Sequence, residues 1–243
     1  MTTFHKDMIM EIMEKSDYRT LLTLCQSSKN FSNLCRTNPE IKRLILEKKT
    51  DDFLWRLQHR QFPSVFDFES PYPVAVASKM GDVELMRELI RRGYDPSEND
   101  NAPLINAVTH EKYQSVDFLL RDRRVDPNAR NYHALIRAAQ QGNYAIVDRL
   151  LQDLRLDPTG RNGEAIDAAA TSYKFFSSML RSRLKDPKMS EEEKREAMAK
   201  LRSEKEYMRI LQRLLHDPRV WNSLSYDDKS KYANQLRGCK IDI

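Results

Sequence analysis

The sequence predicts an all-α chain built from stacked helical repeats, and three observations carry this prediction. The segment LLRDRRVDPNARN at 119–131 returns as LLQDLRLDPTGRN at 150–162, with eight of thirteen positions identical and an offset of 31 residues. The Asp-Pro pairs at 95–96, 126–127 and 157–158 advance by the same 31 residues. Glycine supplies only 6 of 243 residues, which disfavours sheets and phosphate-binding loops. A period near 33 residues is typical of solenoids of paired helices.

Composition narrows the classes of function. The net charge is +5 with acidic and basic residues interspersed, so we do not expect nucleic acid as a partner. No apolar run reaches about 18 residues, so we expect no membrane span. We also expect a cytoplasmic location and a monomer. Cys25, Cys35 and Cys239 are odd in number and lack CxxC spacing. We therefore expect reduced thiols, no disulfide and no zinc site.

Residues 1–50 lie outside the period and predict short helices at about 6–14, 18–26 and 28–36 and another from 39. Asp17 and Asn38 are suited to cap helices, and Pro39 suits a first helical position. Cys25 and Cys35 lie on apolar helix faces and are interpreted as core. The remaining apolar residues predict one compact set: Met8, Ile9, Ile12, Met13, Leu21, Leu22, Leu24, Phe31 and Leu34.

Residues 51–70 form a bridging segment in this interpretation. Trp55, Phe62, Phe66 and Phe68 make it too apolar for a free linker. We expect these side chains to pack against the first repeat and to cover its exposed end.

Each repeat over 71–187 predicts two helices. Short alanine-bearing helices are expected at 72–78, 102–108, 133–139 and 164–170, and apolar second helices at 84–90, 116–120 and 146–151. Proline ends the second helix, because it fixes φ and extends the residue before it. Small residues allow the first helices to approach closely, and these are Ala77, Ala107, Ala138 and Ala168.

Two alignments compete after residue 171. Either 175–187 is the second helix of a fourth repeat, followed by an extra helical pair, or 172–205 is an insertion and 206–220 is that second helix. We favour the first alternative. In both, residues 188–243 are a helical extension or a degenerate final repeat with a cap that covers the terminal apolar stripe.

The repeats resemble the ankyrin family. Asp126 and 128–131 are similar to its hairpin segment, Ala102-Pro103-Leu104 to its helix opener, and Gly81 and Gly142 to the glycine between its helices. The resemblance implies that a protein partner touches the repeat tips and the concave face. The residues so implied are Glu98, Asn99, Asp100, Asn101, Arg130, Asn131, Tyr132, Arg161 and Asn162 at the tips, and Lys79, Thr109, Gln140 and Gln141 on the face. Arg130 and Tyr132 are the expected anchors, because Arg and Tyr are enriched in hot spots.

Residues 7–13, 17–25, 28–31 and 38–40 resemble an F-box. The resemblance implies a small helical domain that binds the linker subunit of a cullin-type ubiquitin ligase. Its binding face would comprise Met8, Ile9, Ile12, Leu21, Leu22 and Leu24. An F-box-like head on such repeats resembles proteins of large DNA viruses, for which the location would be the host cytoplasm.

No catalytic, cofactor or metal motif is present: the five histidines are scattered, and GxSxG, GxxxxGK(S/T) and GxGxxG are absent. We therefore expect no enzyme and no cofactor. The predicted function is that of a protein-protein interaction adaptor. More specifically, the chain would be a substrate receptor of a cullin-type ubiquitin ligase. The alternative is a non-catalytic ankyrin scaffold or virion-associated binding protein without a ligase link.

Basic residues recur after each second helix and allow two interpretations. They are Arg91, Arg92, Arg121, Arg123, Arg124, Arg149, Arg155, Arg181 and Arg183. Stacking would align some of them into a ridge for an acidic partner. Alternatively, they complement the negative ends of helix dipoles, which is the interpretation we favour.

Overall fold

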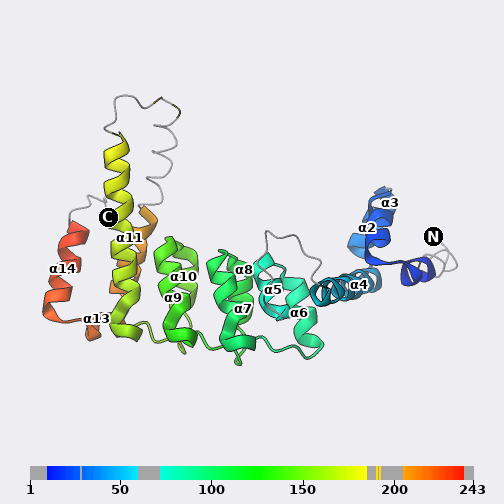
Figure 1. Cartoon of the computed structure of the whole chain (residues 1–243), viewed down its shortest axis with the longest axis horizontal. Coiled ribbons are helices and arrows are strands. Elements are labelled where there is room, and N and C mark those ends of the chain that lie inside the picture. Colours follow the sequence, from blue (N-terminus) through cyan, green and yellow to red (C-terminus); the bar gives the residue numbers. More distant parts are fainter. Residues whose placement is uncertain are drawn as a thin grey trace. The chain divides into compact units, whose positions relative to one another are not determined.

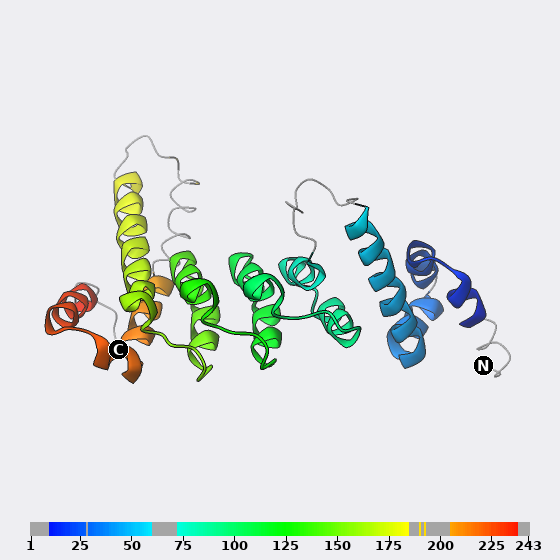
Figure 2. The same ribbon diagram turned by 60° about the horizontal axis from the view of Figure 1, so that its bottom comes forward.

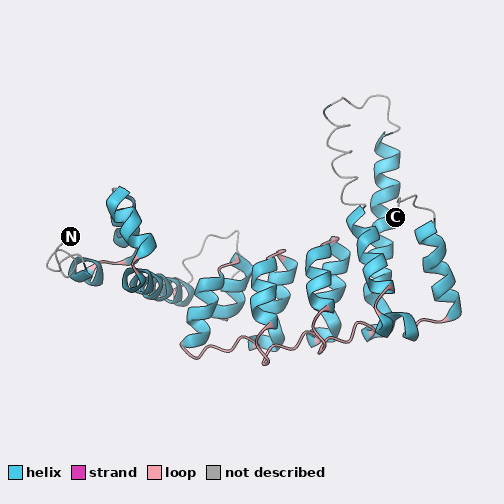
Figure 3. Cartoon of the chain, turned by 180° about the vertical axis from the view of Figure 1, so that it is seen from behind, coloured by secondary structure: helices cyan, strands magenta, loops and turns pink. Residues whose placement is uncertain are grey.

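The computed structural model describes residues 10–27, 29–59, 72–184, 190, 192 and 205–237. These residues are helical or in turns and contain no strand, which confirms the all-α class for the part of the chain described (Figure 3). The chain divides into two compact units, Met1–Ser78 with Asp82–Asp95 and Lys79–Gly81 with Pro96–Ile243. Among the described helices, none combines the length and the apolarity that a membrane crossing requires.

The first unit opens with four helical segments (Figure 1). Residues 10–15 are helical, and α2 (Tyr18–Ser27), α3 (Lys29–Thr37) and α4 (Pro39–Gln58) follow. The predicted caps are confirmed: Asp17 accepts a hydrogen bond from the Thr20 amide at 2.8 Å, and Asn38 accepts one from the Glu40 amide at 2.9 Å. These side chains satisfy amide groups that have no partner inside their helix.

Met13, Leu21 and Ile41 form the buried core of these helices, and Phe31 and Leu34 pack against it as predicted. Ile12 and Leu22 do not join it, since 50% and 38% of their surfaces are exposed. Met8 and Ile9 lie outside the described residues.

Cys25 and Cys35 pack against this core but are joined by a disulfide, so the prediction of reduced, unpaired thiols is wrong for this pair. The reason is tertiary. Helix α3 begins two residues after α2 ends and turns back along it, which brings the two Cα atoms within 5.9 Å. That separation suits a disulfide, whereas a ten-residue sequence spacing indicates nothing about it.

Helix α4 continues past residue 50, the predicted edge of the head, and packs on α6 (Val83–Arg91) within the first unit. Arg92 connects them by donating to Asp51 at 2.7 Å and to the Glu47 carbonyl at 3.2 Å. Lys49 forms an ion pair with Asp82. Contrary to our expectation, Trp55 is exposed and stacks on His59 of its own helix. Phe62, Phe66 and Phe68 lie outside the described residues.

Paired helices make up the second unit. The pairs are α7 (Glu98–Thr109) with α8 (Tyr113–Leu120) and α9 (Ala129–Gln141) with α10 (Tyr144–Leu151), followed by α11 (Gly160–Leu184). Figure 2 shows α7, α9 and α11 side by side in chain order. A further first helix of the same kind, α5 (Pro73–Met80), precedes α6 in the chain.

Alanines line these first helices as predicted, with one correction. Ala77, Ala107 and Ala138 are fully buried. In α11 the corresponding residue is Ala169, which is also fully buried, whereas the predicted Ala168 is only half-buried. Residues 168–170 are all alanine, so the sequence does not indicate which of the three is buried; this depends on how the neighbouring helix packs.

A left-handed turn lies at the start of α7, α9 and α11. Residues 99–101, 130–132 and 161–163 all have positive φ, from +49° at Asn99 to +75° at Gly163. The three turns are 31 residues apart, which reproduces the sequence period. Asn and Gly adopt this conformation readily, whereas Arg and Tyr adopt it at a cost of about 1–2 kcal/mol each. The surrounding stack must therefore stabilise the turns at 130–132 and 161–163.

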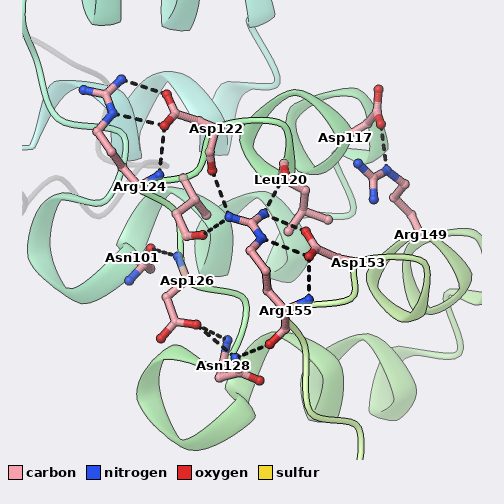
Figure 4. A network of polar contacts seen from close by, with 11 residues as sticks. Asn101, Asp117, Leu120, Asp122, Arg124, Asp126, Asn128, Arg149, Asp153 and Arg155 are labelled. Carbon is pink, nitrogen blue, oxygen red and sulfur yellow. Dashed lines mark hydrogen bonds and ion pairs between the residues drawn. The ribbon is translucent and has the colours of Figure 1, made fainter.

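The two alignments after residue 171 are distinguished by four arginine contacts. Arg155 donates to the Leu120 and Val125 carbonyls at 2.7 and 2.9 Å (Figure 4). Arg219 makes the corresponding contacts in the next repeat. Its partners are the Leu151 and Leu156 carbonyls, at 3.0 and 2.9 Å.

A second pair of contacts repeats in the same way. Arg149 lies 2.7 Å from Asp117, and Arg213 lies 2.6 Å from Asp148. The partners of these arginines are 31 residues apart in the sequence, whereas the arginines themselves, Arg149 and Arg213, are 64 residues apart. About one repeat length is therefore inserted between the two arginines. The helical residues 205–215 are therefore the second helix that follows α11, and the alternative we favoured, with 175–187 in that place, is wrong.

Two helices end the second unit, α13 (Pro218–Ser223) and α14 (Tyr226–Arg237). Tyr232 on α14 donates a 2.6 Å hydrogen bond to Asp167 on α11, and Lys231 adds an ion pair at 3.1 Å. Asp167 occupies the position that Ile105 and Ile136 hold in α7 and α9, where both are buried. A polar residue thus replaces the apolar one where the row of first helices ends, as expected of a capping repeat.

Candidate protein-binding surface

The hairpin tips contribute fewer accessible residues than the sequence predicts. Asn101 is only 7% exposed, and its side chain accepts a 2.8 Å hydrogen bond from the Asp126 amide (Figure 4). It therefore links two consecutive hairpins and is not available to a partner, which corrects its predicted role. Asp100 is exposed, and Glu98 is half-buried.

Arg130 and Tyr132, the predicted anchors, also contact neighbouring hairpins. Arg130 donates to the Asn99 carbonyl at 2.7 Å and lies 3.7 Å from Asp100. The ring of the half-buried Tyr132 lies directly over Gly160, where any Cβ would be 2.4 Å from ring carbons. Arg130 keeps an exposed side chain, whereas much of the Tyr132 ring is used in stacking. Whether either is an anchor stays a prediction.

A row of partly or fully exposed residues runs along the first helices. In α9, His133, Arg137 and Gln140 follow i, i+4 and i+7 spacing and share one face. Residues 134–136, 138 and 139 on the other faces are buried. We call this row the first-helix stripe, and it comprises Asn106, Thr109 and His110 in α7 and its C-cap, His133, Arg137 and Gln140 in α9, and Glu164, Ala168, Thr171 in α11.

Gln141 is not part of the stripe, although the sequence predicts it on the binding face. Its Nε2 donates to the Thr109 carbonyl at 2.8 Å, and its Oε1 is buried without a hydrogen-bond partner among the described residues. Gln141 therefore holds α9 against α7. The side chain of Gln140 points to solvent, and its main-chain carbonyl accepts a 2.9 Å hydrogen bond from Tyr207.

Cations gather around two histidines of the stripe. Partial burial lowers the pKa of His110, and Lys79, Lys112 and Arg137 lower it further. Burial also lowers the pKa of His133, with Arg137 and Arg130 adding to the effect. Burial is the larger cause of both shifts, and the nearby positive charges add to it because they disfavour imidazolium. This cluster was not predicted from the sequence, although the spacing of His133, Arg137 and Gln140 could have indicated it.

Arg124 and Arg155, two of the arginines that follow the second helices, are paired with carboxylates. The guanidinium of Arg155 contacts the last carbonyl of α8 and also lies 2.6 Å from Asp153 (Figure 4). Its hydrogen bonds lower the pKa of Asp153. Arg124 acts in the same way on Asp122. The favoured interpretation, complementing helix C-termini, is confirmed for Arg155, although the helix belongs to the preceding repeat. The side chains of Arg181 and Arg183 lie outside those described.

The residues of the binding face implied by the F-box resemblance differ in their exposure to solvent. Ile12 and Leu22 expose apolar surface, and Leu24 is half-buried. Leu21 is fully buried in the core and cannot touch a partner, which corrects its predicted role. Met8 and Ile9 lie outside the described residues.

Residues 72–162 match the family model described as Ankyrin repeats (3 copies), which confirms the predicted resemblance for these residues. No curated protein and no solved structure matches the chain. Ankyrin repeats are protein-protein interaction modules and are typically non-catalytic. Residues 72–162 of this chain are therefore similar to three ankyrin repeats, and the chain carries a module of the kind that binds other proteins.

Proposed function

We propose that this chain is a protein-binding adaptor whose second unit holds its partner along the first-helix stripe and the adjoining tips at Arg130, Asn131 and Arg161. The pattern of burial in α9 carries the proposal. Stacking uses residues 134–136, 138 and 139, whereas His133, Arg137 and Gln140 remain accessible on one face. Large side chains of mixed polarity, held on rigid helices, suit protein recognition.

Site-specific photo-cross-linking tests this proposal. A photoreactive phenylalanine analogue replaces Gln140 on the stripe, or Arg123 in the loop after α8 as the control; both positions are exposed. A partner that uses the stripe cross-links from position 140 and not from position 123. Equal cross-linking from both positions, or none from 140 while the partner co-purifies, would remove the stripe from the proposal.

A cullin-ligase role is the second candidate, and it is supported by the exposed apolar side chains of Ile12 and Leu22. Linker binding through them would be lost on Ile12→Asp or Leu22→Asp, because each substitution places a charge in an apolar contact. Gln26→Asp is the matched control, since it adds the same charge at an exposed position of α2. A pull-down with the purified linker subunit measures this. If the unchanged protein retains no linker, the scaffold alternative without a ligase link remains.

A further inference from the structure

Six basic side chains form a cluster on the second unit, centred on α9. We call them the basic cluster: Lys79, His110, Lys112, Arg130, His133 and Arg137. They come from three successive repeats, since Lys79 lies near the end of α5, His110 and Lys112 between α7 and α8, and the others in α9. Arg137 lies within electrostatic reach of both histidines, so it is the centre of the cluster.

Two cations of this cluster, Arg137 and Lys112, differ from most arginines nearby in their ion pairing, whereas Arg130 lies 3.7 Å from Asp100. Arg149, Arg155 and Arg213 each have a carboxylate within 2.7 Å. Neither Arg137 nor Lys112 forms an ion pair with any residue in the described ranges. The stem of Lys112 crosses Gly81, whose added Cβ would be 3.0 Å from the lysine Cδ, so this cation is held in place by packing. Two cations without an ion-pair partner among the described residues, beside partly desolvated imidazoles, create a local positive potential.

Acidic residues limit the extent of the cluster. Asp100 lies beside Arg130 at the hairpins, Glu111 adjoins Lys112, and Glu164 and Asp167 occupy α11. A nucleic acid requires a continuous basic track along its phosphates, which these carboxylates interrupt. A short acidic peptide segment requires only a compact patch of cations with polar neighbours.

We infer that the basic cluster is the docking site for an acidic segment, rich in Asp and Glu, of the protein partner. This inference rests on the proposed function, because it names the chemistry that the first-helix stripe recognises. Arg137 contacts carboxylates at the centre of the segment, Lys112 and Arg130 contact it on either side, and Gln140 donates a neutral hydrogen bond.

The test uses the full chain and a fluorescein-labelled oligoglutamate peptide, with binding followed by fluorescence anisotropy. Arg137→Glu is the test variant. Arg123→Glu is the matched control, because it changes the net charge equally at an exposed arginine outside the cluster. We expect Arg137→Glu to weaken binding about tenfold or more and Arg123→Glu by less than about twofold. Binding should also weaken as salt is raised, because screening reduces attraction between exposed charges.

Three results would overturn the inference. These are absence of oligoglutamate binding, equal weakening by both variants, and tighter binding of a labelled single-stranded DNA than of oligoglutamate. Circular dichroism of both variants establishes that the fold is retained. If these results occur while position 140 still cross-links to a protein partner, the adaptor proposal stands and only its acidic chemistry is lost.

Discussion

Arg155→Met tests how the repeats of the second unit are held together. The guanidinium donates to the Leu120 carbonyl at 2.7 Å, to the Val125 carbonyl at 2.9 Å and to Asp153 at 2.6 Å. Methionine preserves most of the packing of the aliphatic stem. It removes these hydrogen bonds together with those to the Asp122 carbonyl at 3.2 Å and to the second Asp153 oxygen at 2.9 Å. The effect therefore measures the polar contacts of this guanidinium, both to the carbonyls of the preceding repeat and to Asp153 in its own loop.

The magnitude follows from the burial of the two partners. The Asp153 side chain is 8% exposed, and breaking a buried pair from one side costs about 3–5 kcal/mol, because a charge stays buried without its partner. The Arg155 side chain is 36% exposed, so solvent already screens part of its interactions. The freed carbonyls can also turn to water. We expect the free energy of unfolding to fall by about 2–3 kcal/mol.

Urea unfolding followed by circular dichroism measures this loss. The transition midpoint should fall by about 1 M, for a slope of about 2–3 kcal/mol per M. Arg121→Met is the control, since Arg121 also lies 2.6 Å from a carboxylate, that of Asp117, but its side chain is 73% exposed. The control should lose less than about 0.5 kcal/mol. If the two variants lose the same free energy, the reasoning from burial is refuted.

Three further predictions concern single positions. Glu111 has a φ of +56° where the next repeat has Gly142, so Glu111→Gly should raise the free energy of unfolding by about 0.5–1 kcal/mol; an unchanged urea midpoint would contradict this. Gly142→Ala should instead lower it by about 2 kcal/mol, because the added Cβ would lie 2.7 Å from the buried Tyr207 ring; no loss would refute the close approach. Hydrogen bonds from Arg91 and Arg92 lower the pKa of Glu88 from 4.5 to about 2, so its stabilising contribution is complete above pH 4.5 and is lost as the pH falls toward 2. Glu88→Gln should lose about 2–3 kcal/mol at pH 7 and show a weaker acid dependence of the urea midpoint than the unchanged chain; equal acid dependence would exclude Glu88 as the titrating group.

Local features of this fold were predictable from the sequence because they depend on residues close together in the chain. The caps at Asp17 and Asn38 act within three residues. The Asp-Pro stops depend on the covalent geometry of proline, and the 31-residue period follows from self-similarity. The stripe residues Arg137 and Gln140 share a face because the helix returns every 3.6 residues.

Other features were decided only by the tertiary structure, because they depend on which surfaces meet. Two segments had the composition of the missing second helix, and the contacts of Arg213 and Arg219, made across 63 to 68 positions, select 205–215. The sequence predicts Asn101 as an exposed tip residue, but its side chain accepts a hydrogen bond from the Asp126 amide, 25 positions away, and is buried. The pairing of Cys25 with Cys35 likewise requires α3 to turn back along α2. A sequence pattern states what each element prefers by itself, whereas burial and charge compensation depend on neighbours that only folding brings together.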